Sequence, residues 1–341
     1  MAKMTKNSAS TIVDIANALG VSPSTVSRAL KDHPYISQAT KDKVKKTAAK
    51  LGYRRNTLAA GLRNKHSNIL GLVVPRISMY FQSSVITAIQ NTVHEMGYDV
   101  IICQSKDSYP LEVEVVNALY GSRVEGLIAS CTMYTTDFSH FKIFTDNHIP
   151  VVFYDRVPKS YPAHVIRGDD FQGGYQAGKF LVSRGCKDIA FINGVMTCNL
   201  YQDRLVGLKA AMREARAPLK KNRVFSHELS AENAEKTCRK LFDRKPFPDA
   251  VFCANDTTAI VVLQYARNKG IRVPEDLKIL GYSNDPRSGI ITPAISSIEQ
   301  FPAEMGVQTA NTMLDLLQKR NFPRKAVEKI MPIELVSRAT T

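Results

Sequence analysis

The chain has 341 residues, 44% of them hydrophobic, and its 46 Lys or Arg against 31 Asp or Glu leave a net charge of +15. No apolar run approaches the roughly 20 residues that span a bilayer, and the polar N-terminus lacks the apolar segment of a signal peptide. We therefore expect a cytoplasmic protein with no membrane partner. The length predicts one or two globular domains besides a small basic unit.

The positive charge is concentrated near the N-terminus. Residues 1–66 contain 13 Lys or Arg against three Asp, which leaves +10 in that segment. A compact basic segment indicates a polyanionic partner. The six cysteines show no C-x-x-C spacing and the seven histidines are scattered. We expect reduced thiols, no metal and no cofactor.

Two short amphipathic helices are predicted at the start of the chain. In TIVDIANALG, Thr11 is the expected cap and Gly20 the turn; in VSPSTVSRAL, Ser22 caps the helix and Pro23 takes its first position. Such a pair forms a helix-turn-helix, whose second helix enters the major groove of DNA. We expect Ser24 and Arg28 to reach bases, and Thr25 and Ser27 to contact phosphates. The alternative is a small helical bundle without a ligand.

A third helix is predicted from Ser37 to about Leu51, and its five lysines form either a solvated face or a phosphate contact. The next segment, residues 56–63, gives a helix of about two turns with Asn56 as its cap. A helix this short is marginal in water. We expect it to be disordered until a partner orders it. Leu62 is the apolar residue of this segment, and it either inserts into DNA or packs against the core.

From Ile69 onward, short apolar strands alternate with amphipathic helices, which predicts parallel sheets covered by helices on both faces. The expected strands are 69–75, 99–103, 126–130, 151–155, 188–194, 250–255 and 278–283, and the expected helices lie near 82–96, 110–121, 171–184, 202–216, 231–242 and 256–269. The predicted fold is a small all-α head followed by an α/β core with two doubly wound parallel-sheet subdomains.

The chain resembles the lactose-repressor/galactose-repressor family of bacterial transcription regulators. The similarity is carried by TIVDIANALGVSPSTVSRAL, NTLAAGL, GLVVP, VVFYDR, ANDTTAI, ILGYSND and ELVSRATT. The resemblance implies a core like that of periplasmic sugar-binding proteins of type I, a small-molecule effector in its cleft and DNA contacts by the head and hinge. The DNA-contacting residues it implies are Thr11, Ser22, Pro23, Ser24, Thr25, Ser27, Arg28, Tyr53, Asn56 and Leu62.

The same resemblance implies the division of the chain. The expected parts are a helix-turn-helix domain at 1–55, a hinge helix and linker at 56–67, and a core at 68–341, with an N-subdomain of about 68–167 plus 299–328 and a C-subdomain of about 168–298 plus 329–341. No heptad extension follows IMPIELVSR, so we expect a homodimer matched to a pseudo-palindromic double-stranded operator.

The candidate effector site consists of polar and aromatic residues that follow predicted strands. Ligands of open α/β sheets bind at the carboxyl ends of strands, and carboxylates, amides and arginine suit the hydroxyls of a sugar. Some of these carboxylates, Asp155 and Asp256, could instead cap helices or turns. The family resemblance implies effector contacts at Tyr80, Phe81, Asp155, Arg204 and Asp256, and Ser283 stands where many relatives have an Asp. The predicted effector-binding residues are Arg76, Tyr80, Phe81, Asp155, Arg204, Asn255, Asp256, Ser283 and Asn284.

Enzyme alternatives are not favoured. The segment from Gly173 to Lys179 imitates a phosphate-binding loop, but Phe180 replaces the needed Ser or Thr and the segment has a helical pattern. No nucleophile elbow or dinucleotide motif is present. A solute-binding protein would lack the basic head. The prediction is a sequence-specific transcriptional regulator, a repressor, whose operator affinity is controlled by a small ligand such as a sugar.

Overall fold

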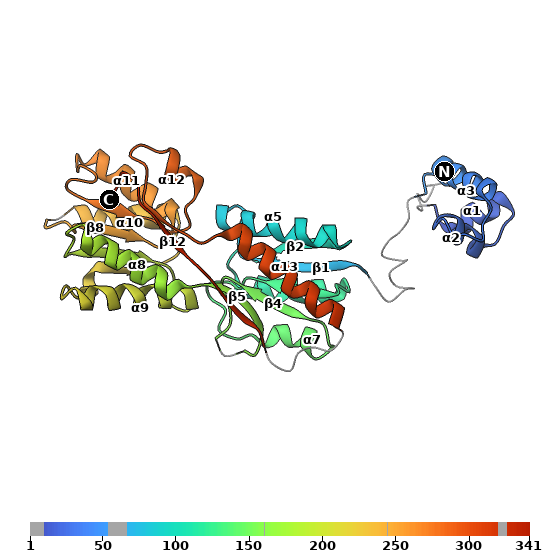
Figure 1. Cartoon of the computed structure of the whole chain (residues 1–341), viewed down its shortest axis with the longest axis horizontal. Coiled ribbons are helices and arrows are strands. Elements are labelled where there is room, and N and C mark those ends of the chain that lie inside the picture. Colours follow the sequence, from blue (N-terminus) through green and yellow to red (C-terminus); the bar gives the residue numbers. More distant parts are fainter. Residues whose placement is uncertain (1–9, 54–66, 160, 244, 320–325) are drawn as a thin grey trace, which may run out of the picture. The chain divides into compact units, whose positions relative to one another are not determined.

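The computed structural model describes residues 10–53, 67–159, 161–243, 245–319 and 326–341 (Figure 1). The chain divides into two compact units, residues 1–67 and 68–341, called here the head and the core. No helix of the described residues is long and apolar enough to cross a membrane.

The described head consists of three short helices, α1 (Ile12–Leu19), α2 (Pro23–Ala29) and α3 (Gln38–Lys50). Each begins at its predicted cap, because the side chains of Thr11, Ser22 and Ser37 accept the backbone N–H three residues on. Gly20 ends α1 with a φ of 65°, a left-handed conformation that glycine adopts without strain. A small buried core holds the helices together: Ile15, Ala16, Val26, Ala29, Val44 and Ala48.

The first sheet of the core has six parallel strands in the order β11-β5-β4-β3-β1-β2. Helices α5 (Tyr80–Glu95) and α13 (Pro302–Lys319) pack on one face, and α6 (Tyr109–Gly121), α7 (Lys142–Thr145) and the short 3₁₀ helix Ser139–Phe141 lie on the other. The strands are β1 (Ile69–Val74), β2 (Asp99–Gln104), β3 (Gly126–Ala129), β4 (Val151–Tyr154), β5 (His164–Gly168) and β11 (Glu328–Met331).

The second sheet has four parallel strands in the order β7-β6-β8-β9. Helices α8 (Asp170–Ser183) and α9 (Asn199–Glu214) cover one face, and α10 (Ala231–Phe242) and α11 (Asp256–Asn268) cover the other. The strands are β6 (Ile189–Asn193), β7 (Val224–Ser226), β8 (Ala250–Cys253) and β9 (Lys278–Leu280); the short elements are the 3₁₀ helix Lys221–Arg223 and α12 (Pro286–Ile290).

The chain passes between the two subdomains three times. It crosses after β5, after β10 (Ser297–Glu299) and after β11, and β12 (Glu334–Val336) then pairs antiparallel with β10. The expected subdomain boundary at 328/329 cuts through β11. Because β11 pairs with β5 in the first sheet, that boundary is corrected to the segment after Met331.

Glycines set the close packing of α8 on α9. A Cβ at Gly174 would lie 2.0 Å from the Arg204 carbonyl oxygen, and one at Gly207 would lie 2.0 Å from the Phe171 carbonyl oxygen. The segment from Gly173 to Lys179, which imitates a phosphate-binding loop, lies within α8 and is helical, as its pattern predicts. Its glycines allow the backbones of α8 and α9 to approach each other.

All seven strands and six helices predicted for the core are present. The prediction missed β5, β7, β10, the short helices α7 and α12, and the 18-residue α13. Strand β5 was missed because it follows β4 with no helix between them, so the alternation of strand and helix that identified the others is interrupted there.

Candidate functional site

Helix α2 carries the residues predicted to contact DNA. Pro23, Ser24 and Arg28 are exposed, which suits contacts with base edges in the major groove. Thr25 is half-buried, and its hydroxyl lies 2.9 Å from that of Ser22. Ser27 is only 9% exposed, so most of its small side chain is covered within the head, and its contact with a phosphate stays a prediction.

Two further predicted DNA contacts, Thr11 and Tyr53, lie outside α2 in the described part of the head. The Thr11 hydroxyl accepts the Asp14 backbone N–H, and the Asp14 carboxylate accepts the Thr11 N–H in return, which fixes the start of α1. Tyr53 is half-buried against the core of the head. Asn56 and Leu62 lie outside the residues that the structure describes.

A cavity of about 240 Å³ lies at the carboxyl ends of strands from both sheets of the core. Six predicted effector residues line it: Arg76, Tyr80, Phe81, Asn255, Asp256 and Ser283. The prediction missed several residues of the wall. Asp107 follows β2, where the strand-end rule could have selected it, and Arg156 stands at the end of β4 beside the predicted Asp155. Glu228 follows β7, whose three residues are too few for a strand to be recognised from the sequence. The remaining wall residues are Ser78, Met79, Met133, Tyr201, Leu229, Ser230, Thr257, Asp285 and Arg287.

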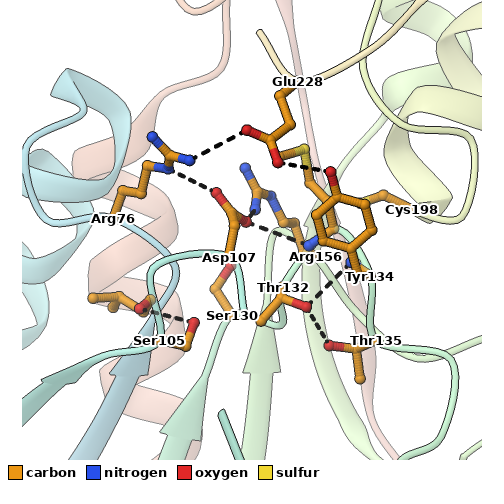
Figure 2. Close-up of polar contacts among 12 residues, drawn as sticks. Arg76, Ser105, Asp107, Ser130, Thr132, Tyr134, Thr135, Arg156, Cys198 and Glu228 are labelled. Carbon is orange, nitrogen blue, oxygen red and sulfur yellow. Dashed lines mark hydrogen bonds and ion pairs between the residues drawn. The ribbon is translucent and has the colours of Figure 1, made fainter. Parts of the chain in front are cut away.

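Asp107 joins two arginines on the first-sheet side of the cavity. Its carboxylate pairs with Arg156 and accepts the Arg76 Nε–H at 2.9 Å (Figure 2). Burial opposes ionisation of Asp107, but the charges and hydrogen bonds of the two arginines hold its pKa below the usual value. Asp107 is therefore an anion at neutral pH, and it neutralises part of the positive charge that faces the cavity.

Glu228 reaches from the second subdomain to the first. Its carboxylate lies 3.6 Å from Arg76 Nη2 and accepts the Tyr134 hydroxyl at 2.7 Å, as Figure 2 shows. Burial and the hydrogen bond to Glu228 raise the pKa of Tyr134 to about 12, so Tyr134 remains a hydrogen-bond donor. These contacts join the two subdomains at the edge of the cavity.

Asp256 and Asn255 lie at the start of α11. Asn255 is the cap of this helix, since its side chain accepts the Thr258 N–H at 2.9 Å. The Asp256 carboxylate accepts the Asp285 N–H at 2.6 Å and the Ser297 hydroxyl at 2.8 Å. Burial raises the pKa of Asp256 to about 7. Asp256 thus faces the cavity and also ties α11 to the neighbouring loops.

Three predicted effector residues do not line the cavity. Asp155 is buried and accepts Gln82 Nε2 at 3.1 Å, and burial raises its pKa to about 6. Arg204 is buried in an ion pair with Asp170. Asn284 donates to Glu299 at 2.8 Å. Asp155 follows β4 and Asn284 follows β9, whereas Arg204, selected through the family resemblance, lies within α9. Their side chains bond to other residues of the core, and direct contact of these three residues with an effector stays a prediction.

The head and the cavity together are typical of one class of protein, the DNA-binding transcriptional regulators with a two-subdomain α/β core. Residues 11–56 match the family described as bacterial regulatory proteins, lacI family, and residues 179–341 match the periplasmic binding protein-like domain. The regulator DegA of Bacillus subtilis strain 168 is 32% identical over 333 residues, which cover 97% of this chain and 98% of DegA. The chain belongs to the lacI family of bacterial regulatory proteins.

Solved structures share this fold. The lac repressor dimer bound to operator and the anti-inducer ONPF has a TM-score of 0.84 at 24% identity, with 98% of this chain and 99% of that chain covered. A family regulator from Enterococcus faecium with bound ribose has a TM-score of 0.70 at 25% identity, with 80% and 98% covered. Both structures align with nearly their whole length.

Proposed function

We propose that this regulator is a cytoplasmic repressor whose operator affinity is controlled by a sugar or sugar derivative. The observation that carries the proposal is the polar cavity of about 240 Å³ between two subdomains of a chain that also has a helix-turn-helix head. A ligand that contacts both subdomains favours one arrangement of the cleft and so changes the population of DNA-competent molecules.

The DNA contacts in this proposal come from the exposed side of α2. Ser24 and Arg28 contact bases, Thr25 contacts a phosphate, and the caps at Thr11 and Ser22 fix where the two helices begin. Tyr53 packs half-buried against the core of the head. The lysines of α3 add phosphate contacts that do not depend on base sequence.

The effector contacts come from both sides of the cavity. Arg76, Tyr80 and Phe81 face the ligand from the first subdomain, and Asn255, Asp256 and Ser283 face it from the second. Guanidinium, carboxylate, amide and hydroxyl groups suit paired hydrogen bonds to sugar hydroxyls, and aromatic side chains suit the apolar side of a sugar ring. The ribose bound to the Enterococcus faecium regulator supports this ligand class.

The proposal also includes a homodimer and a hinge. Two copies related by a two-fold axis match a pseudo-palindromic operator, and the lac repressor dimer on its operator supports this assembly. In each copy Leu62 inserts between base pairs in the minor groove, at a cost in unstacking of a few kcal/mol. Leu62→Ala is expected to weaken operator binding without changing effector affinity in DNA-free protein, and light scattering is expected to show a dimer.

The test begins with selection of an operator from random DNA, followed by binding measurements at several salt concentrations. We expect sequence-specific binding that weakens with salt, as phosphate contacts require. A thermal-shift screen of sugars then identifies the effector, since a ligand at 100 times its Kd adds about 2.7 kcal/mol to stability. Failure to select any operator, or an effector that leaves operator affinity unchanged, would contradict the proposal.

A further inference from the structure

The charges around the cavity are already paired with one another. Of the described residues that line it, four carry carboxylates and three carry guanidinium groups. Arg156 pairs with Asp107, Arg76 pairs with both Asp107 and Glu228, and Arg287 pairs with Asp285 at 2.5 Å. The fourth carboxylate belongs to Asp256. An anionic ligand would therefore have to break an existing ion pair within a site that has an excess of acidic groups.

Glu228 competes with an anionic ligand for the guanidinium group of Arg76. Phosphates and carboxylates bind guanidinium best through two parallel N–H bonds. On Arg76, Nε faces Asp107 and Nη2 faces Glu228. The Glu228 side chain is 39% exposed and that of Arg76 is 43% exposed, so this pair lies where an entering ligand meets it. Figure 2 shows Glu228 placed between Arg76 and Tyr134.

Uncharged polar groups remain for a ligand on both sides of the cavity. Ser78 and Tyr80 provide hydroxyls from the first subdomain. In the second, the Ser230 and Thr257 hydroxyls accept one bond each, from the Asn233 N–H and from Arg287, and the Ser283 hydroxyl donates to Gln300, so each keeps part of its bonding capacity for a ligand. These groups act as donors and acceptors toward a hydroxyl without a net charge. The wall thus accepts a polyhydroxy compound without disturbing the ion pairs.

We propose that Glu228 makes this cavity selective for uncharged polyhydroxy ligands by occupying the edge of Arg76 to which a phosphate or carboxylate would otherwise bind. The proposal rests on the proposed function, because it takes the cavity to be the effector site. It adds that sugar phosphates and sugar acids are excluded, and it assigns that exclusion to one side chain of the second subdomain.

The decisive variant is Glu228→Gln in the full-length protein. Glutamine keeps the size of the side chain and accepts the Tyr134 hydroxyl, but it removes the negative charge from Arg76. Inorganic phosphate is the probe, and binding is measured by equilibrium dialysis at constant ionic strength. We expect Glu228→Gln to lower the Kd for phosphate at least tenfold, and we expect the added Arg76→Gln substitution to abolish that gain.

The matched control is Glu235→Gln. Glu235 is an exposed carboxylate of α10 that pairs with Arg239 at 2.7 Å, so this change removes the same charge away from the cavity. Phosphate bound by the basic head is common to all variants, and Glu235→Gln should show that background alone. An equal gain in both single variants would mean that net charge governs binding, and it would overturn the proposal.

Two further results would also overturn it. One is phosphate binding by the unaltered protein that is as tight as that of Glu228→Gln and is lost on Arg76→Gln. The other is a larger thermal shift of the unaltered protein with glucose 6-phosphate than with any uncharged sugar. The latter result would leave the proposed function intact. A different result is that no sugar or sugar derivative shifts the melting temperature of the unaltered protein, while Glu228→Gln still binds phosphate more tightly. That result would contradict the proposed function and support the exclusion of anions.

Discussion

Removal of the Arg204 guanidinium tests whether this side chain supports the core. Arg204 Nε lies 2.8 Å from Asp170, its Nη1 donates to the Ala254 carbonyl at 3.0 Å, and its guanidinium lies 3.5 Å from the Tyr282 ring centroid. In Arg204→Ala the buried Asp170 carboxylate keeps the Tyr282 hydroxyl but loses its ion pair. Breaking a buried pair in this way costs about 3–5 kcal/mol, which is a large share of the 5–15 kcal/mol typical of folded proteins.

The loss should depend on pH in a direction that the charges determine. Burial raises the pKa of Asp170, and Arg204 partly offsets that effect. Without Arg204 the pKa rises further, so the folded state of the variant retains a proton that the unfolded state releases above about pH 4. Stability of the variant therefore falls as pH rises, and its deficit against the unaltered protein should be larger at pH 8 than at pH 5.

Urea unfolding of the core at these two pH values measures both effects. A double variant, Arg204→Met with Asp170→Asn, removes both charges and should recover most of the loss, because an apolar replacement of a buried pair is often close to neutral. Lys236→Ala is the control: Lys236 pairs with Glu232 on an exposed helix face, and the urea midpoint should not change. A loss below about 1 kcal/mol in Arg204→Ala, or no recovery in the double variant, would refute the reasoning.

Three other substitutions test separate parts of the molecule. Arg28→Ala should cost about 1–3 kcal/mol on the selected operator and broaden its preference at one base pair; equal weakening on all sequences in anisotropy titrations would contradict a base contact. Gly207→Ala should destabilise the core by about 1–3 kcal/mol or more in urea unfolding, because its Cβ would lie 2.0 Å from the Phe171 carbonyl oxygen. Gly121→Ala is the control and should leave the stability unchanged, because no atom lies within 4 Å of its Cβ. Asp256→Asn should reduce the loss of core stability between pH 5 and 8. The reason is that the folded state holds the Asp256 proton up to about pH 7, whereas the unfolded state does not. If the free energy of unfolding of the variant depends on pH as steeply as that of the unaltered protein, other groups cause the loss.

Local sequence signals predicted the head well because they act over three or four residues. The caps at Thr11, Ser22 and Ser37 form as their residue types indicate. Ser27 was assigned to the outer side because helical phase gives an angle but not the position of the neighbouring helices. Its burial follows from how α1 and α3 pack against α2, which is tertiary information.

The cavity was predicted in part for a related reason. Strand ends identified Arg76, Asn255 and Asp256, since parallel strands carry their following residues to one edge of the sheet. The same rule selected Asp155, whose side chain turns to Gln82, and the family resemblance selected Arg204 within α9, whose side chain turns to Asp170. Spacing along the chain places a residue at the edge of a sheet, but the direction of its side chain depends on partners that are distant in sequence.

The order of the strands has a consequence for synthesis of the protein. The first sheet begins with β1 at Ile69 but is completed only by β11, and Thr340 hydrogen-bonds to Ile279 beside the second sheet. At about 5–20 residues per second, the ribosome synthesises β11 roughly 13–52 s after β1. The head has its own buried core and depends on none of these strands. A nascent chain therefore presents the DNA-binding head well before the two sheets of its core are complete.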